Sequence, residues 1–433
     1  ISNYFLGIIS VRNYDDENAH KYLKKVKLLK NHHSRFNAEF LRNLILLEKF
    51  HEAFAFSESV WDKNELFFES DLLLGLNSFK KKDYKNSEKY FKRLNKTSEY
   101  NFFFDDFIGN VLIAWSKASQ GKKEESFDVL KKIPETYRHL KKTQKVFLKC
   151  YFDMEDTEFF YKEIIENKEY NFLRYNFFLA NYFLFNNKEK QAIKIIKNAR
   201  KKNRSNLLIQ ETENFLRKGK YDKIKNFFNC KNPNDSIAEF FYVIANLYSS
   251  EKNYRLSNFY LKISEFLNNK FLTNAALLAE NFYYEKKFQL SKNIYESLKP
   301  IGPAYSWYAA KSIASILLEE NGKKYSVKSL KKEFNSLSNP NFEHYYELAN
   351  FYKDNEYYEK SIKHYSLALK DLKKDHPLVP KIFDRRGTSY ERLGDWENAE
   401  KDLLESLKIL PDQAHVLNYL AYSWIDKGIN LEK

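Results

Sequence analysis

Few residues in this chain have the types and spacing that catalysis requires. The neighbours His32 and His33 would point to different faces at a helix end, which is a poor arrangement for chelating one metal ion. His344 and His364 are expected on different helices, and the acidic pairs Asp15-Asp16 and Asp105-Asp106 are typical of turns or helix starts. The sequence also contains no P-loop, nucleophile elbow or zinc-protease motif. We therefore expect no enzyme activity, no cofactor and no metal.

Asparagine is the residue type that best suits a binding role here. Asn181, Asn246 and Asn350 each follow a Leu-Ala or Ile-Ala pair in a similar helical pattern. An Asn amide can donate to a carbonyl and accept from an N–H, so a row of them could hold an extended peptide backbone. Because Asn is abundant in the chain, chance recurrence stays open as the alternative.

A local group of arginines offers a second binding candidate. Arg385 and Arg386, with Arg392 nearby, could form an anion-binding edge for an acidic partner. The alternative is that they pair on the surface with acidic neighbours such as Asp384 and Glu391.

The two cysteines, Cys150 and Cys230, lie 80 residues apart, and neither belongs to a CxxC motif. Each stands in an apolar or helical stretch, so we expect two buried free thiols. No run of 18 or more apolar residues is present, so no membrane-spanning helix is expected in this sequence.

Composition favours a helical protein with a substantial core. Of 433 residues, 43% are hydrophobic and 17% aromatic, with only 8 Pro and 10 Gly in the chain. Such a chain can bury a core, and it lacks the turn residues of a β-rich fold.

The formal net charge is +15, carried mainly by Lys, since only 13 of the 73 basic residues are Arg. Lys suits solvated helix faces, whereas Arg is favoured for bidentate phosphate recognition. The Lys, Asn and aromatic richness runs along the whole chain, which we interpret as a compositional bias. A dedicated anion-binding surface is the alternative.

The elements that would position these residues are helix pairs. From Pro380 to Pro411 the sequence places Gly387, Tyr390, Gly394, Ala399 and the final Pro411 in a fixed spacing. Large apolar residues recur at positions 4, 7, 11, 24 and 27 of the unit, and small ones at 8 and 20. The same spacing recurs along the chain, strictly every 34 residues over the first three units. Small residues at 8 and 20 would let two helices pack closely.

This pattern resembles the tetratricopeptide repeat. The resemblance implies an all-α, right-handed solenoid of about 13 stacked antiparallel helix pairs, continuous over 1–433, with Lys299-Pro300-Ile301-Gly302-Pro303 as a repeat joint rather than a linker. The expected repeats are 1–33, 34–67, 68–101, 107–138, 173–203, 238–271, 272–303, 342–375, 380–413 and a partial 414–433, with degenerate units at 139–172, 204–237 and 304–341.

In such repeats the first helices line a concave groove, and positions 2, 5, 9 and 12 commonly face it. Asn181, Asn246 and Asn350 all stand at position 9. The family's carboxylate clamp is not reproduced, since Arg385 stands where it would have Asn. The resemblance implies a scaffold that binds a protein or peptide in its groove, in a bacterial assembly or envelope process. A nucleic-acid-binding helical repeat is the alternative, motivated by the charge.

The chain begins and ends within a repeat, so we expect it to be a fragment of a longer protein. The compartment then depends on what precedes Ile1: the periplasm or outer membrane if that is a signal peptide, and otherwise the cytoplasm. The partner and the oligomeric state are not determined by the sequence.

Overall fold

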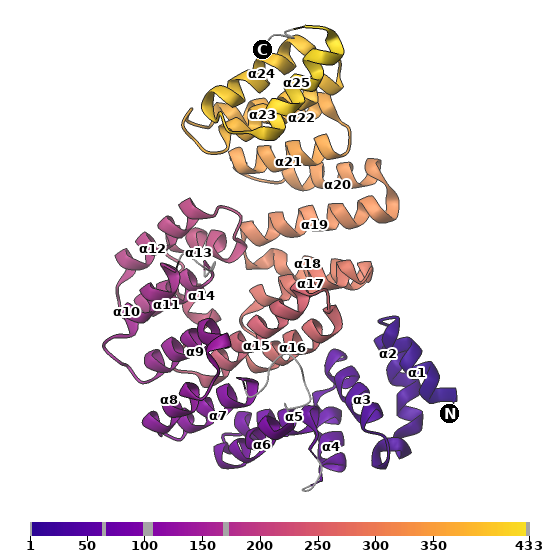
Figure 1. The fold of residues 1–433 in the computed structure, drawn as a ribbon, viewed down its shortest axis with the longest axis vertical. Coiled ribbons are helices and arrows are strands. Elements are labelled where there is room, and N and C mark those ends of the chain that lie inside the picture. Colours follow the sequence, from indigo (N-terminus) through magenta and orange to yellow (C-terminus); the bar gives the residue numbers. More distant parts are fainter. Residues whose placement is uncertain (1, 63–65, 98–106, 168–172, 430–433) are drawn as a thin grey trace. The chain divides into compact units, whose positions relative to one another are not determined.

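The computed structural model describes residues 2–62, 66–97, 107–167 and 173–429, and every regular element within these ranges is a helix (Figure 1). The pair Asp105-Asp106 and the last four residues fall outside them. The first eighteen α-helices are α1 (Ser2–Arg12), α2 (Asp16–Leu23), α3 (Ser34–Leu46), α4 (Phe50–Val60), α5 (Phe68–Lys80), α6 (Tyr84–Thr97), α7 (Phe107–Ser119), α8 (Lys123–Lys131), α9 (Arg138–Tyr151), α10 (Thr157–Ile165), α11 (Tyr175–Phe185), α12 (Glu189–Lys202), α13 (Leu207–Arg217), α14 (Tyr221–Phe227), α15 (Pro233–Ser250), α16 (Tyr254–Leu267), α17 (Ala275–Tyr284) and α18 (Phe288–Leu298).

The remaining helices complete the repeat pattern. They are α19 (Pro303–Asn321), α20 (Lys323–Asn335), α21 (Phe342–Asp354), α22 (Tyr358–Lys370), α23 (Val379–Arg392), α24 (Trp396–Ile409) and α25 (Ala414–Lys427). Short 3-10 segments are η1 (Lys24–Asn31), η3 (Glu135–Tyr137), η4 (Leu272–Asn274) and η5 (Lys299–Ile301). The all-α solenoid of stacked helix pairs predicted from the sequence is therefore confirmed.

The chain forms two compact units, residues 1–306 and 307–433, where the sequence predicted one continuous solenoid. The division falls within α19, directly after the Pro/Gly cluster that we interpreted as a simple repeat joint. Glu211 caps the start of α19 by accepting from the Ala304 N–H at 2.8 Å. An added Cβ at Gly302 would lie 2.0 Å from the same carboxylate, so a larger residue there would have to displace the Glu211 carboxylate.

Each predicted repeat from 1–33 to 380–413 contains two α-helices, including the three degenerate ones. The largest shift is in the eighth pair, whose first helix, α15, begins at Pro233 rather than at Ala238. Asn232 caps it, and Pro233 supplies the fixed backbone angle favoured at a first helical position. Turns within the pairs use left-handed backbone at their first helix's end, for example at Gly121, Gly219 and Gly394.

Small residues at position 8 let the two helices of a pair approach closely. A Cβ added to Gly75 would lie 2.3 Å from the ring of Phe91, and one added to Gly387 would lie 3.0 Å from Leu403. Phe91 and Leu403 stand at position 24 of the same repeats and are fully buried. In these two repeats the small residue at position 8 thus packs directly against the large residue at position 24.

Helices α15 and α16 form the centre of residues 1–306. In Figure 1 they lie between α9 on one side and α3 and α5 on the other. Every residue from Ser257 to Ser264 in α16 is buried, as is every residue from Asp235 to Phe241 in α15. A helix on the outside of a solenoid buries only a stripe. Burial over consecutive residues means that these two stretches of α15 and α16 are enclosed on all sides.

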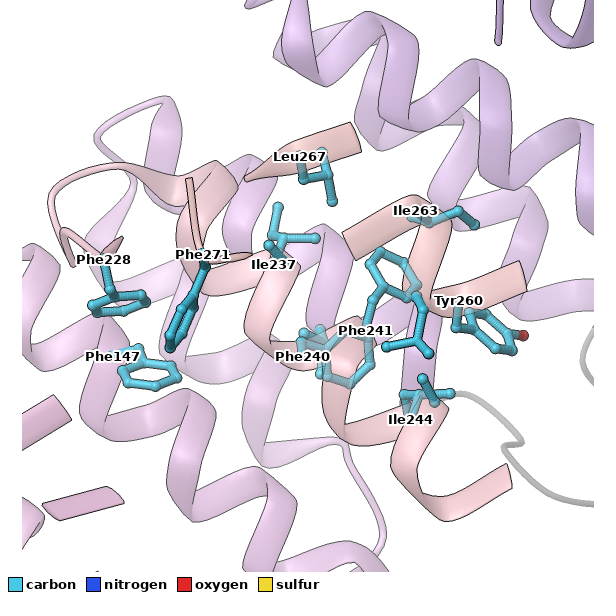
Figure 2. Close-up of a cluster of buried hydrophobic side chains, with 14 of the residues drawn as sticks. Phe147, Phe228, Ile237, Phe240, Phe241, Ile244, Tyr260, Ile263, Leu267 and Phe271 are labelled. Atoms are coloured by element: carbon cyan, nitrogen blue, oxygen red, sulfur yellow. The ribbon is translucent and has the colours of Figure 1, made fainter. Parts of the chain in front are cut away.

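Aromatic side chains fill the space around this pair. Figure 2 shows Phe240 and Phe241 of α15 beside Tyr260 of α16, and Phe147 of α9 facing Phe228. The Phe147 and Phe228 ring centroids lie 5.2 Å apart, and Phe107 meets Phe240 at 5.3 Å. The hydrophobic core of residues 1–306 is consequently one connected cluster. Residues 307–433 instead show smaller separate clusters along the repeats.

The two cysteines form a disulfide, with Cα atoms 5.9 Å apart. The predicted burial is correct, since Cys150 is 3% and Cys230 8% exposed, but the predicted free thiols are wrong. Cys150 ends α9 and Cys230 follows α14. They meet because the intervening helix pairs turn back on themselves, a long-range contact that helical periodicity does not reveal.

Candidate functional site

The first helices of successive pairs in residues 307–433 contact one another through a row of polar side chains, which we name the first-helix face. Three of its links are Lys311–Glu347 between α19 and α21 at 2.7 Å, Asn350–Arg385 between α21 and α23 at 2.9 Å, and Asp384–His415 between α23 and α25 at 3.0 Å.

These links remain accessible to solvent. The side chains of Lys311 and Glu347 are 31% and 35% exposed, and that of His415 is 67% exposed. Lys381 and Asn418, which stand at groove-facing positions 2 and 5 of their repeats, are also exposed. The first-helix face therefore presents mixed charge and amide groups that a partner can reach.

In residues 1–306, a polar contact between two successive first helices, α3 and α5, is buried beneath α16. Arg42 of α3 donates from Nε to Glu69 of α5 at 2.8 Å, and the Glu69 side chain is only 5% exposed. Burial lowers the pKa of the Arg42 guanidinium, but Glu69 and Glu39 outweigh that effect, so its pKa lies above the ordinary value. Helix α16 packs on α3 and contributes Tyr260 to the surroundings of Arg42.

Ion pairs hold α16 and its neighbour α18 against the N-terminal repeats. Arg255 pairs with Asp16, and Lys287 reaches the same carboxylate at 3.1 Å. Lys262, buried within α16, pairs with Glu48 at the end of α3. Basic residues of the later repeats thus meet acidic residues of the first two repeats.

An aromatic anchor completes this internal interface. The Phe266 ring of α16 stacks on Phe50 of α4 with centroids 4.4 Å apart. Lys80 of α5 places its Nζ 3.7 Å from the centre of the Phe266 ring and donates to the Phe266 carbonyl at 2.7 Å. The first repeats of the chain therefore bind a helix pair of the same chain.

Of the predicted binding residues, Asn181 lies in this interior. It is 2% exposed, and its amide donates to the carbonyls of Ile224 and Phe228 at 3.0 and 2.9 Å. Those carbonyls stand at the end of α14, so Asn181 ties α11 to α14. Its amide hydrogens are used within the chain.

The other two asparagines have different surroundings, and the three form no ladder of side-chain contacts. Asn246 of α15 is exposed. Asn350 of α21 is partly buried, and its Oδ1 accepts from the Tyr365 hydroxyl at 2.7 Å and from Arg385. Asn350 and Arg385 are thus brought together, and both belong to the first-helix face.

Arg386 is placed differently from its neighbour Arg385. It makes a two-pronged ion pair with Asp402 of α24 at 2.7 and 2.8 Å and donates to Ser366 of α22. Its side chain is 16% exposed, so it joins adjacent repeats. Arg392 is mostly exposed and lies 3.6 Å from Glu391.

The sequence did not reveal the roles of Glu347, Asp384 and His415 in the first-helix face. Each stands at a repeat position where no apolar pattern applies, so only its charge and its place on a first helix could have suggested it. Among the described residues, no three His, Cys, Asp or Glu side chains lie close enough together to hold a metal ion. Nor is any helix in those ranges both long and apolar enough to cross a lipid bilayer.

Comparison with known proteins returned structural likenesses only. No protein-family model and no curated protein matches the chain. Two of the solved structures that resemble the chain cover 99% of it. One is the APC/C hetero-tetramer Cut9-Hcn1, at 14% identity, TM-score 0.36 and 84% of that chain. The other is yeast Tom70, at 12% identity, TM-score 0.37 and 96% of that chain. The class of the protein, an all-α helical-repeat solenoid, rests on its own helix pairs.

Proposed function

We propose that the protein is a non-enzymatic scaffold whose first-helix face in residues 307–433 binds a segment of another protein. The observation that carries the proposal is the contrast between the two units. In residues 1–306 the first helices α3, α7 and α9 pack against the chain's own α15 and α16, whereas in 307–433 the polar row from Lys311 to His415 stays at least partly exposed.

The internal interface indicates what kind of segment these repeats accept. Basic side chains of α16 form ion pairs with acidic side chains of the first repeats, as Lys262 does with Glu48. The Phe266 ring of α16 also packs between Phe50 and Lys80. An amphipathic helix with charged flanks and an aromatic anchor therefore suits a surface built from such first helices. We expect the partner segment to be helical and to carry both signs of charge, because the first-helix face itself alternates Lys311, Glu347, Arg385 and Asp384.

The test is a selection of helical peptides on the full chain. A random helical peptide library is displayed and selected for binding to the wild-type protein, and the selected peptides are measured against two variants. One variant changes the face (Lys381→Glu with Asn418→Arg). The other changes second-helix residues, the exposed Lys328 to Glu and Glu405, whose side chain is 43% exposed, to Arg (Lys328→Glu with Glu405→Arg).

The proposal predicts that the face variant weakens the selected peptides by at least about tenfold, because like charges opposed at an interface cost more than 1 kcal/mol. The second-helix variant should bind them as the wild type does. If peptides bind both variants equally, or lose affinity only for the second-helix variant, the first-helix face is not the binding surface.

The disulfide bears on the compartment. Cys150 and Cys230 are the chain's only cysteines, and both are in the bond. Disulfides persist in oxidising compartments and are rare in the reducing cytosol. We infer that the protein works in an oxidising compartment, the first of the two alternatives that the sequence left open.

Thiol trapping tests this inference. Protein from its native source is quenched in acid and treated with a maleimide-polyethylene glycol reagent, with and without prior reduction. A chain from an oxidising compartment shifts by two adducts only after reduction. Two adducts without reduction would place it in a reducing one.

A further inference from the structure

The net positive charge of the protein belongs entirely to one of the two units. Residues 307–433 contain 20 Lys or Arg and 20 Asp or Glu, so the whole net charge of +15 belongs to residues 1–306. Within that unit, the segment 188–225 holds 13 basic and 4 acidic residues, a net charge of +9 in 38 residues. The net positive charge is therefore local, although the Lys richness itself runs along the whole chain.

Helix α12 carries the centre of this charge as a row that we name the α12 stripe: Lys190, Lys194, Lys197 and Lys201. The spacing i, i+4, i+7, i+11 puts all four on one helix face over about 16 Å. All four are exposed. The buried residues of α12 are Ala192, Ile196 and Ala199, which lie on the opposite face.

Lysines on other helices of this unit form ion pairs with glutamates of the same helix, whereas the lysines of the α12 stripe do not. Lys92 pairs with Glu88 at 2.7 Å, and Lys162 pairs with Glu158 at 2.8 Å, each one turn along its own helix. None of the four stripe lysines forms an ion pair within the described part of the chain. Like charges one turn apart disfavour a helix slightly, so the row gains nothing for folding.

Exposed aromatic rings lie at the N-terminal end of the stripe. Phe185 ends α11, directly before the turn into α12, and is 42% exposed. Phe159 of α10 is 65% exposed, and its neighbour Glu158 pairs with Lys188 at the start of α12. Lys225 of α14 places its Nζ 5.7 Å from the centre of the Phe185 ring. Helices α10, α12 and α14 thus meet at one edge near the start of α12, where Lys225 lies beside the Phe185 ring and Glu158, next to Phe159, pairs with Lys188.

We propose that this edge, the α12 stripe with Phe159 and Phe185, docks the protein on an anionic lipid surface. Clustered lysines attract such a surface, and aromatic rings enter the headgroup region. Nucleic acid also attracts lysine. We commit to lipid because the disulfide indicates an oxidising compartment, whereas nucleic acid lies chiefly in the cytosol and nucleus, where disulfides are rare. That choice rests on the compartment inferred above.

The chain supplies a matched control for the stripe. Lys324, Lys328 and Lys331 on α20 have the same i, i+4, i+7 spacing as Lys190, Lys194 and Lys197, and they are exposed without ion pairs in the described residues. They lie in the unit of zero net charge. Two triple Lys→Gln variants of the full chain, one on α12 and one on α20, therefore remove equal charge from equivalent positions.

Both variants and the wild type are measured in vesicle co-sedimentation, with phosphatidylcholine alone and with added phosphatidylglycerol. The proposal predicts that the wild type binds only the anionic vesicles, that high salt abolishes binding, and that the α12 variant binds on the order of 100-fold more weakly. The α20 variant should bind as the wild type does, and Phe159→Gln should weaken binding without altering its salt dependence. Thermal melting confirms that the exposed substitutions leave the fold intact.

Three results would overturn the proposal: an α12 variant that keeps wild-type vesicle binding, equal losses in the α12 and α20 variants, or wild-type protein that prefers single-stranded RNA or duplex DNA to the vesicles. The last result would assign the stripe to nucleic acid. Vesicle binding and thiol trapping are independent measurements, so a failure of the compartment inference is distinguishable from a failure of the lipid surface.

Discussion

Arg174 and Glu239 form a two-pronged ion pair inside residues 1–306, with Nε and Nη2 each 2.8 Å from a carboxylate oxygen. Arg174 precedes α11 and Glu239 lies in α15, so the pair fixes the enclosed helix to the repeats around it. Burial raises the pKa of Glu239, and Arg174 opposes that rise. Arg174 also donates to Asn274 at 2.8 Å and lies 4.0 Å from the centre of the Tyr242 ring.

Removing one partner of this pair should destabilise the protein strongly. Glu239→Ala leaves the Arg174 charge buried without its carboxylate, which costs about 3–5 kcal/mol of unfolding free energy. The double variant Arg174→Met with Glu239→Leu should recover most of that loss, because two apolar side chains need no counter-charge. Urea unfolding measures both. A double variant less stable than Glu239→Ala would contradict the packing described for α15.

Asn181 and Asn246 should behave as opposites when each is changed to Ala. Asn181→Ala leaves the Ile224 and Phe228 carbonyls without their buried donor and should lower the unfolding free energy by about 1–3 kcal/mol. Asn246→Ala removes an exposed side chain and should lie within about 0.5 kcal/mol of the wild type. Equal melting temperatures for the two variants would show that the Asn181 contacts are not formed.

The disulfide should contribute measurably to stability. Reduction, or Cys150→Ser with Cys230→Ser, should lower the unfolding free energy by about 2–5 kcal/mol, because the bond joins α9 to the segment after α14 across 80 residues. Denaturant unfolding with and without reductant measures the effect, and the double Ser variant is the control, since reductant should not change it. A wild-type curve insensitive to reductant would mean that the bond is absent in solution.

Asp235 should make stability depend on pH. Burial raises its pKa from 3.8 to about 6, against the opposing effects of the Asn229 N–H, Lys270 and Asn232. The folded chain then holds the proton more tightly than the unfolded chain, so the contribution is fully present below pH 3.8 and is lost as pH rises through about 6. The difference is about 3 kcal/mol. Relative to Asp235→Asn, the unfolding free energy of the wild type should fall as pH rises across this window. If the unfolding free energies of the two proteins change in parallel with pH, the pKa of Asp235 is not raised.

Much of the fold follows from the sequence because repeat packing is local. The contact of Gly75 with Phe91 and that of Gly387 with Leu403 each join two helices of one repeat, at separations set by helix geometry. A pattern of small and large residues is sufficient to predict such contacts. The helix pairs of the degenerate repeats could also be predicted, because they too depend on contacts within a single repeat.

The enclosure of α15 and α16 could not be predicted in the same way. It depends on contacts such as Lys262 with Glu48 and Phe50 with Phe266, which join residues more than 200 positions apart. Small rotations between successive repeats decide whether such residues meet, and no single repeat encodes them. The sequence could not separate accessible site residues from structural ones for the same reason. Asn350 and Arg385 lie in the first-helix face, whereas Asn181 and Arg386 make contacts that hold the chain itself together.

Hydrogen–deuterium exchange on the full chain with a selected helical peptide tests most directly where a partner binds. The proposed function predicts added protection in α21, α23 and α25, with exchange in α3, α15 and α16 unchanged. Protection of α3 to α9 accompanied by faster exchange in α15 and α16 would contradict it. That result would mean that the partner displaces the chain's own helices and binds in their place.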